Sequence, residues 1–543
     1  MVLPAILPKV AAQWLFTFHR AARKLRRHAF QLYYRNAARP PTAASQQQQQ
    51  QTSSAAGPDK SGGAFFPDAA GRAVAFDMHG ALLRSAALFP YFMLVACEGG
   101  GLLRAALLLC ACPLAWALGD RAAVRVMAFV AFAGLTPGDV DLVARAVMPK
   151  HYLDQLDAAV YDRLWLPAGR KVVLTAAPRV MSEWFLREYM AADAVVGLEL
   201  QTVTVGRRRY FTGLLSGPEL PRKALKEARG AEDATADVGV VSSSSPLDQH
   251  FAPCCKEVYV VSRENAKTGR LPRDRYPKPL IFHDGRLAFL PTPAAMLAFF
   301  LFLPLGVILS VIRISVGILL PFKTHFAAAA MFGVRFRTSG LRAPPADGAQ
   351  RRGVLYVCTH RTLVDPIMLS SALQSPVPAL TYSLSRLSEL MAPIKTVRLT
   401  RDRARDAETM SRLLRQGDLA VCPEGTTCRE PYLLRFSPLF AELADDMEPV
   451  ALDAQVTMLY GTTASGHKWL DPVAFFANPV PSYRVEFLGA VPREWTRAGG
   501  RTGVEVANWV QQRLGEALEF ECTGLTRRDK YMTLAGNDGV VAK

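Results

Sequence analysis

After residue 72, short apolar runs alternate with amphipathic stretches along most of the chain, which predicts strands alternating with helices. The run 74–76 is followed by Asp77, and the run 171–174 is followed by Thr175, so each predicted buried strand ends in a polar side chain. Further apolar, strand-like runs occupy 354–358 and 419–421. This alternation to about residue 525 predicts an α/β fold.

Two stretches are more apolar than ordinary surface helices. Residues 287–322 carry a single charge, Arg313, which fits one long membrane span or two helices that enter and leave the same leaflet. A buried core hairpin is the alternative, although the run is long for one. Residues 86–119 are also apolar but contain Glu98 and Arg104, so we expect them to touch a bilayer without forming a clear single span.

The N-terminal region has a different composition. Residues 1–57 contain no acidic side chain, and their cations alternate with large apolar residues at roughly helical spacing. We expect 1–40 to be a basic amphipathic segment that binds an anionic membrane surface, or alternatively a mitochondrial presequence. The glutamine run 46–51 predicts a disordered linker over 41–70.

Composition narrows the class of protein. The 543 residues suffice for two or three domains, and 50% hydrophobic residues suit an enzyme with a few membrane-embedded segments. The net charge of +17 points to an anionic partner, but no zinc-finger spacing or basic-aromatic array supports nucleic acid. The nine cysteines show neither zinc nor redox spacing, so we expect reduced thiols and no structural metal.

His360 and Asp365 are the leading candidates for chemistry. His360 follows the strand predicted at 354–358, and Asp365 precedes Pro366, which favours a helix start at this point. A loop between them would let the carboxylate reach Nδ1 and leave Nε2 free to take a proton from a hydroxyl. The alternative is a helix-capping aspartate beside an incidental surface histidine.

A second group of residues lies about sixty positions further on. The strand predicted at 419–421 runs into a turn at Glu424-Gly425-Thr426, with Arg429 close behind. Backbone N–H groups in such a turn bind phosphate or a developing oxyanion, and arginine suits phosphate recognition. Upstream, 395–403 forms a short strand-like element with cations, for which a solvated charged edge is the alternative; these cations include Arg398, Arg401 and Arg403.

Four blocks in this order, 359–366, 395–403, 422–431 and 448–451, resemble the four motifs of the glycerolipid acyltransferases. The segment 272–286 (PRDRYPKPLIFHDGR) is similar to a signature of the land-plant glycerol-3-phosphate acyltransferases. The likeness runs from about residue 72 to the C-terminus and also touches the first 35 residues. One departure is Thr359, where the first motif usually has asparagine. Threonine still donates a hydrogen bond, so we expect an altered rate rather than inactivity.

The resemblance implies a C-terminal acyltransferase domain at 330–530 that uses acyl-CoA and glycerol-3-phosphate as substrates and needs no cofactor. His360 would deprotonate a glycerol hydroxyl, which then attacks the thioester, and Asp365 would orient the imidazole. Both substrates held together supply proximity, so no acyl-enzyme is required. The residues expected at the glycerol-3-phosphate site are Arg398, Arg401, Arg403, Glu424, Gly425, Thr426 and Arg429.

The upstream region, 71–262 with the apolar insert 86–119, resembles a haloacid dehalogenase-like phosphatase. Asp77 stands where the nucleophile is expected and Thr175 matches the second motif, but His79 replaces the second acid. Lys223 or Lys226 would be the lysine. The later block 239–246 contains no carboxylate to hold Mg²⁺. We therefore expect phosphatase activity to be lost and the domain to persist as a scaffold or lipid-binding platform.

The leading hypothesis is a membrane-bound enzyme that acylates glycerol-3-phosphate, possibly at sn-2, and releases lysophosphatidic acid for cutin, suberin or pollen-wall lipid. The alternatives are acylation of a lysophospholipid, phosphate hydrolysis through Asp77, and a non-catalytic membrane scaffold. The basic N-terminal segment is compatible with the endoplasmic reticulum, which we expect, and with a mitochondrial membrane.

Overall fold

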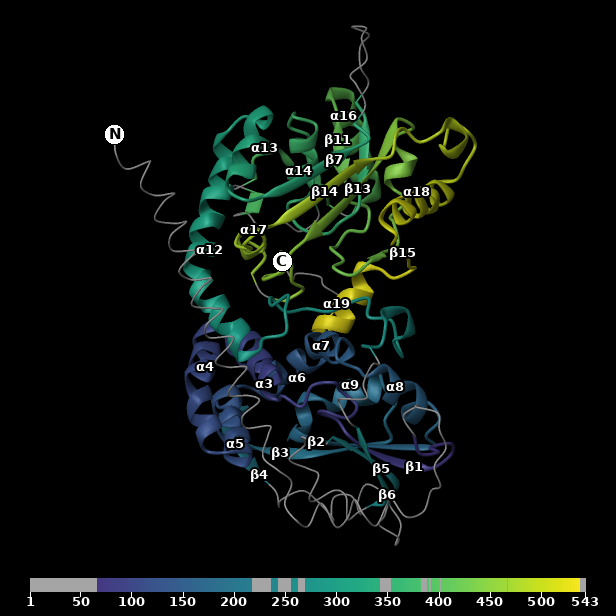
Figure 1. Ribbon diagram of the computed structural model, residues 1–543. Coiled ribbons are helices and arrows are strands. Elements are labelled where there is room, and N and C mark those ends of the chain that lie inside the picture. Colours follow the sequence, from purple (N-terminus) through teal and green to yellow (C-terminus); the bar gives the residue numbers. More distant parts are fainter. Residues whose placement is uncertain are drawn as a thin grey trace, which may run out of the picture.

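The structure is a computed structural model that describes residues 66–216, 236–242, 255–261, 269–341, 353–381, 388–389, 392–400, 402–465 and 467–537. The predicted segment 1–40, the linker as far as residue 65, and both Lys223 and Lys226 lie outside these ranges. Two mixed sheets, one in each half of the chain, are flanked by helices (Figure 1). The predicted α/β fold is confirmed.

The N-terminal half is built on a six-stranded sheet with the order β4-β3-β2-β1-β5-β6, parallel except for the β3–β4 pair. The buried strand β1 lies inside this sheet, as expected for an apolar run covered on both faces. Parallel strands end at the same edge, so Asp77, Thr175 and Ser242 are brought to one edge. The strands are β1 (Ala73–Asp77), β2 (Arg170–Pro178), β3 (Ala194–Val205), β4 (Arg208–Ser216), β5 (Ala236–Ser242) and β6 (Cys255–Val261).

The helices of this half cover the apolar sheet. The predicted insert 86–119 resolves into α3 (Phe89–Leu94), η1 (Val95–Gly99) and α4 (Leu102–Ala117). Every residue of α3 is buried in the core, so the large apolar side chains that are exposed within 86–119 belong to α4 and the residue after it. The remaining helices are α5 (Asp120–Phe132), α6 (Pro137–Ala146), α7 (Met148–Leu153), α8 (Ala158–Val160), η2 (Tyr161–Trp165), η3 (Arg179–Met181) and α9 (Glu183–Glu188).

The C-terminal half contains a seven-stranded sheet with the order β10-β9-β11-β8-β13-β14-β7, in which only the β13–β14 pair is antiparallel. The fully buried strand β8 lies at its centre, between β11 and β13. The strands are β7 (Arg335–Ser339), β8 (Leu355–Cys358), β9 (Ala379–Thr381), β10 (Thr396–Arg398), β11 (Leu419–Val421), β13 (Met447–Gln455) and β14 (Ser482–Phe487). A separate pair joins β12 (Tyr432–Leu433) to β15 (Glu521–Cys522).

Helices flank this second sheet and reach back to the first half. The helix α18 packs on β13, and the last helix, α19, packs on α6 of the N-terminal half (Figure 1). The helices are α14 (Asp365–Ala372), α16 (Arg403–Gln416), α17 (Leu470–Phe476), α18 (Gly503–Leu518) and α19 (Arg527–Ala535), with short turns η5 (Arg273–Arg275), η6 (Phe440–Glu442) and η7 (Arg493–Trp495).

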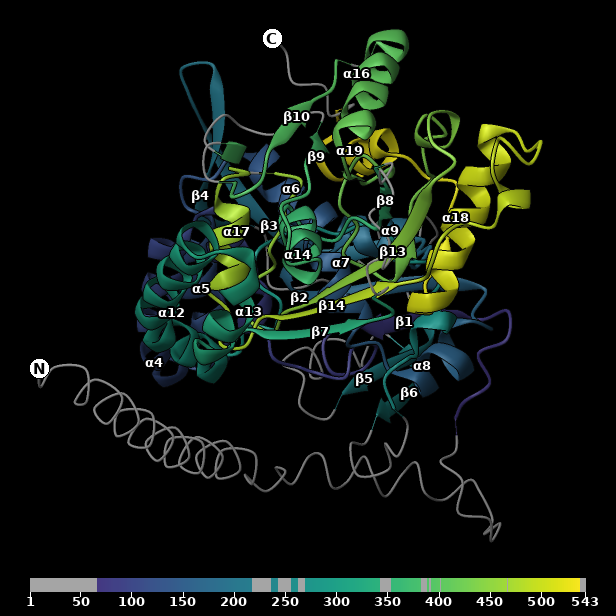
Figure 2. The same ribbon diagram turned by 90° about the horizontal axis from the view of Figure 1, so that it is seen from above.

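The apolar stretch 287–322 forms one continuous helix, α12 (Pro293–Leu319), and α13 (Phe322–Met331) follows it. Its 27 residues correspond to a length of about 40 Å, enough to cross a bilayer. Within the described ranges it is the single unbroken helix that is long and apolar enough to do so. The alternative of two helices within 287–322 is therefore wrong, because a single helix forms there. The helix α12 runs along one side of the molecule, past α4 and α17 (Figures 1 and 2).

Arg313 shows how this apolar helix is attached. Its buried guanidinium donates hydrogen bonds to the carbonyls of Phe332 (2.9 and 2.6 Å), Asn478 (2.6 Å) and Pro479 (3.1 Å), and also to Phe476. Ser310 on the same face donates to the carbonyl of Val473 at 2.9 Å. One face of α12 is thus held by polar contacts, while the opposite side exposes residues such as Val307 and Val311.

Replacing Arg313 with leucine should destabilise the protein by roughly 2–4 kcal/mol, because several buried carbonyls lose a charged donor. Thermal unfolding in detergent micelles measures the effect. The matched variant Val311→Ala removes two methyl groups from the exposed side of the same helix and should change stability by less than about 0.5 kcal/mol. Equal melting temperatures for Arg313→Leu and wild type would contradict the structural role.

Candidate functional site

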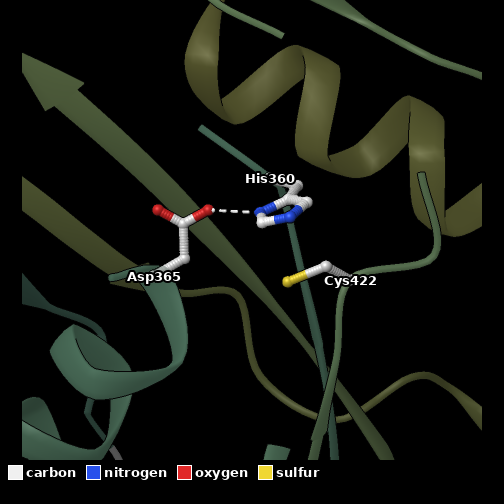
Figure 3. A group of neighbouring side chains, drawn as sticks. All are labelled: His360, Asp365 and Cys422. Atoms are coloured by element: carbon white, nitrogen blue, oxygen red, sulfur yellow. Dashed lines mark hydrogen bonds and ion pairs between the residues drawn. The ribbon is translucent and has the colours of Figure 1, made fainter. Parts of the chain in front are cut away.

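His360 lies at the carboxyl end of the central strand β8, and Asp365 begins α14 after a short loop. Pro366 occupies the first turn of that helix, where its missing N–H has no consequence. The loop folds the carboxylate back, so that Nδ1 of His360 lies 2.8 Å from Oδ2 of Asp365 (Figure 3). The Asp365 side chain is fully buried, whereas that of His360 is 17% exposed. The predicted contact between the two side chains is present.

The Asp365 carboxylate accepts hydrogen bonds from several donors besides the imidazole. It accepts hydrogen bonds from the backbone N–H groups of Arg361 (2.6 Å) and Thr362 (3.0 Å), from the Thr362 hydroxyl (2.9 Å), and from the Tyr483 hydroxyl. Because the carboxylate is the acceptor, Nδ1 of His360 carries the proton and donates a hydrogen bond to it. Nε2 is then the basic nitrogen, as a general base requires.

Thr359 stands before the histidine, at the position where the first motif usually has asparagine. Its buried hydroxyl donates to the Leu452 carbonyl and accepts from the Leu452 N–H, both at 2.8 Å. The side chain therefore extends the pairing of β8 with β13 by one step. This contact fixes the backbone immediately before His360, which is consistent with an active site that tolerates threonine.

Glu424 holds the other side of His360. One carboxylate oxygen accepts from the His360 N–H at 2.8 Å, and the other accepts from the Leu434 N–H at 3.0 Å. Burial raises the pKa of Glu424 to about 7, although both amides act in the opposite direction. Both oxygens accept from backbone amides, so Glu424 positions the histidine; the substrate contact expected from the sequence stays a prediction.

Gly425 closes the turn after Glu424. Its φ of +67° lies in the left-handed region, and its N–H donates to the Cys422 carbonyl at 3.1 Å. This amide is therefore used inside the turn. Gly425 suits the conformation of the loop, and its expected place at the substrate site stays a prediction.

Cys422 lies beside the pair, and one ligand-type atom from each of His360, Asp365 and Cys422 falls within 4.8 Å of the others (Figure 3). Burial raises the pKa of the Cys422 thiol far above its ordinary value, so the sulfur keeps its proton. Nδ1 of His360 is already bound to Asp365. The trio is an imidazole–carboxylate pair with a half-buried thiol beside it.

Beyond the turn, the chain wraps around a cavity whose walls include Arg361 and Thr362, the two residues that follow His360 in the chain. The Cys428 N–H donates to the His360 carbonyl at 2.9 Å, and Arg361 donates to the carbonyls of Arg429 (2.6 Å) and Glu430 (2.8 Å). The cavity has a volume of about 190 Å³, and both Arg361 and Arg429 line it. Its other walls are Thr362, 454–456 and 460–462.

The plant-type segment 272–286 connects this loop to both halves of the molecule. Asp284 accepts from Arg429 (3.2 Å) and from the Ser465 hydroxyl (2.7 Å), while Nε2 of His283 lies 2.6 Å from Glu430. Burial alone would raise the pKa of Glu430, but the attraction of His283 and Arg273 outweighs it and lowers that pKa. We call 272–286 the connecting segment.

The end of the connecting segment reaches the N-terminal half. The side chain of Arg286 donates to Asp471 at 2.6 Å, and its backbone N–H donates to Glu98 of η1 at 2.7 Å. The motif resemblance drew attention to this segment, but nothing in the spacing of His283, Asp284 and Arg286 indicated these partners. They are contacts between positions more than a hundred residues apart.

The upstream arginines have different surroundings. Arg398 ends β10, at the same edge of the sheet as His360 because β10, β9, β11 and β8 are parallel, and it pairs with Glu389 at 2.8 Å. Arg401 and the side chain of Arg403 lie outside the described residues. Of the predicted substrate residues, Thr426 and Arg429 therefore lie in the described loop beside His360.

In the described residues of the N-terminal half, the phosphatase remnant around Asp77 shows no cluster of metal-binding side chains. His79, which stands where an acid is expected, is buried and lies 3.4 Å from the Thr175 hydroxyl through Nδ1. Burial lowers the pKa of His79 to about 3, so the imidazole is neutral. The described end of β5 contributes Ser242 and no carboxylate. Asp77 alone does not match the oxygen-rich ligand set that Mg²⁺ prefers.

Comparison with known proteins agrees with both halves of this description. Residues 73–261 match the family model "Glycerol-3-phosphate acyltransferase RAM2-like, HAD-like domain", and residues 337–459 match the acyltransferase family model. The chain is 53% identical to glycerol-3-phosphate acyltransferase 1 of Arabidopsis thaliana, over 86% of this chain and 81% of that protein. It is 45% identical to glycerol-3-phosphate acyltransferase RAM2 of Petunia hybrida, over 86% of this chain and 97% of that protein.

Asp365→Asn should lower kcat for acyl transfer by about 10³–10⁴-fold, because an amide in this position no longer selects the tautomer with a basic Nε2. KM values should change little. Tyr483→Phe removes one donor to the same carboxylate but leaves the imidazole contact, so its kcat should fall by less than about tenfold. Steady-state kinetics of the two purified variants make the comparison; equal losses would mean that Asp365 acts only in packing.

Proposed function

The chain belongs to the plant glycerol-3-phosphate acyltransferase family, and from this premise we propose that His360 catalyses transfer of an acyl group from acyl-CoA to glycerol-3-phosphate. The observation that carries the proposal is the 2.8 Å contact between Nδ1 of His360 and a fully buried carboxylate. That contact leaves one partly exposed basic nitrogen at the carboxyl edge of a parallel sheet, where ligands of α/β proteins usually bind.

The residues support direct transfer between the two substrates. Nε2 of His360 takes the proton of a glycerol hydroxyl while that oxygen attacks the thioester carbon. The tetrahedral intermediate collapses by breaking the carbon–sulfur bond, and the imidazolium returns its proton to the departing thiolate of CoA. Because the Cys422 thiol is kept protonated by burial, it is a poor competing nucleophile, and no acyl-enzyme is needed. The products are lysophosphatidic acid and CoA.

The cavity lined by Arg361 and Thr362, directly after His360 in the chain, is the proposed place for the acceptor. Arg361 and Arg429 are among its lining residues, and planar cations of this kind suit phosphate. The proposal includes no cofactor, because acyl-CoA is a substrate. Attack through the sn-2 hydroxyl and a place in cutin, suberin or pollen-wall lipid synthesis rest on the family resemblance alone.

Membrane association is supported by an apolar surface on α4 and α12. Leu103 and Trp116 on α4 are 78% and 66% exposed, and Leu319 at the end of α12 is 77% exposed. The two helices contact one another, so exposed apolar side chains occur on neighbouring helices. We propose the endoplasmic reticulum membrane as the location, with a mitochondrial membrane as the alternative to be separated by fractionation.

A lysophospholipid acceptor would use the same base and the same donor. Glycerol-3-phosphate is preferred here because the similar proteins are glycerol-3-phosphate acyltransferases. A competition assay with both acceptors in one reaction distinguishes them.

His360→Ala should reduce acyl transfer by about 10²–10⁴-fold through loss of the general base. The assay measures labelled lysophosphatidic acid made from glycerol-3-phosphate and acyl-CoA by detergent-solubilised enzyme. Cys422→Ala is the matched control for a thiol nucleophile and should retain most of the activity. Loss of activity in Cys422→Ala together with survival in His360→Ala would replace this mechanism with a covalent one.

The N-terminal half should release no phosphate. Wild-type enzyme incubated with Mg²⁺ and lysophosphatidic acid should yield no inorganic phosphate, because His79 and Ser242 supply no metal-binding carboxylate. Asp77→Asn should leave acyl transfer unchanged. Phosphate release by wild type that disappears in Asp77→Asn would restore the phosphohydrolase alternative.

A further inference from the structure

Lys530, on the C-terminal helix α19, is a buried charge that the mechanism above does not use. It is 6% exposed, and its ammonium donates to the Thr427 carbonyl (2.6 Å), the Thr427 hydroxyl (3.2 Å) and the Thr426 hydroxyl (3.4 Å). These threonines directly follow Glu424 and Gly425. A helix about a hundred residues further along the chain therefore places a cation against the loop beside His360.

No carboxylate in the described ranges lies within 4 Å of this ammonium. A buried charge without an ionic partner is costly, since hydroxyls and a carbonyl replace hydration only in part. Burial, followed by repulsion from Lys468 and Arg429, lowers the pKa of Lys530 to about 7. The site therefore has an excess of positive charge that an anion would offset.

The remaining charges around Lys530 are accounted for. Cys428 and Asp284 favour its charged form, but Asp284 is already bound to Arg429. From α6, which packs on α19, Asp139 belongs to a capping box and Asp141 pairs with Arg145 at 3.0 Å. On α19 itself, Asp529 caps the helix through Thr526.

Two hydroxyls connect Lys530 to the cavity that Arg361 and Arg429 line. The Thr427 hydroxyl, which accepts from Lys530, lies 2.8 Å from the Thr462 hydroxyl, and Thr462 lines the cavity. Arg429, also in the cavity wall, donates to the Thr462 carbonyl. The cavity is thus approached by cations from the motif loop and from the C-terminal helix.

We propose that Lys530 is a substrate-recognition residue: together with the hydroxyls of Thr426, Thr427 and Thr462, it supplies positive charge to a subsite for the phosphate monoester of glycerol-3-phosphate. This deepens the proposed function and rests on it. The residue lies outside the four acyltransferase motifs, in the segment after β15. A phosphate dianion in the cavity stabilises the ammonium, so the acceptor binds with uptake of a proton by Lys530 above neutral pH.

The direction of the pH effect follows from the charge on lysine. Below about pH 7 the free enzyme carries the ammonium, and above it the amine is largely neutral. KM for glycerol-3-phosphate should therefore rise between pH 7 and 9 in wild type, while KM for acyl-CoA should not follow it. Lys530→Arg keeps the charge throughout this range, so its KM for glycerol-3-phosphate should be nearly constant.

The experiment uses the full-length enzyme in micelles and varies the two substrates separately. Lys530→Met should raise KM for glycerol-3-phosphate by about ten- to a hundredfold, as expected for loss of a charged contact, with a much smaller effect on KM for acyl-CoA. Arg528→Met is the matched control, because it removes a cation from the exposed side of the same helix and should leave both KM values unchanged.

Calorimetry on the wild type keeps the proposal testable if Lys530→Met does not fold. Titration with glycerol-3-phosphate at pH 8, in buffers of different ionisation enthalpy, should show uptake of a fraction of one proton. Absence of proton uptake, a KM effect on acyl-CoA instead of the acceptor, or equal effects on melting temperature and kcat without a change in KM would overturn it. The general-base mechanism is tested independently, because His360→Ala reports on kcat whatever Lys530 does.

Discussion

The buried carboxylate of Asp365 is the contact on which the rest of the site depends. It joins the end of β8 to the start of α14, and it accepts from the imidazole, two loop amides and two hydroxyls. Such a group is costly to bury unless nearly every lone pair is satisfied, and here the loop has the shape that satisfies them. The tautomer of His360 is therefore set by the folding of the loop, before any substrate binds.

A second layer of contacts fixes the backbone on either side of the histidine. Thr359 is bound to β13, and Glu424 receives the His360 N–H. Precise placement of a catalytic base depends on supporting residues of this kind, because an error of about 1 Å costs a large factor in rate. Among the motif residues, His360 is thus the base and Asp365 orients it, while Thr359 and Glu424 hold the backbone.

Much of the fold and part of the site could be predicted from the sequence. The strand ends at Asp77 and His360 were predictable because apolar runs and a following proline are local signals. The contacts of Glu424 and Gly425 were not, since a carboxylate in a glycine turn has the same local pattern whether it binds substrate or backbone amides. Lys530 gave no signal at all, because its burial arises only when α19 packs between distant elements.

The N-terminal half has lost the acids of a phosphatase but retains a structural reason to be present. Glu98 in η1 accepts the N–H groups of Arg286 and Leu287 at 2.7 and 3.0 Å, at the end of the connecting segment whose Asp284 binds Arg429. Burial raises the pKa of Glu98, and the hydrogen bonds from these two amides act in the opposite direction. The same arginine lines the cavity that Arg361 and Thr362 also line. The packing of the N-terminal half against the connecting segment therefore couples that half to Arg429, whatever chemistry Asp77 and His79 retain.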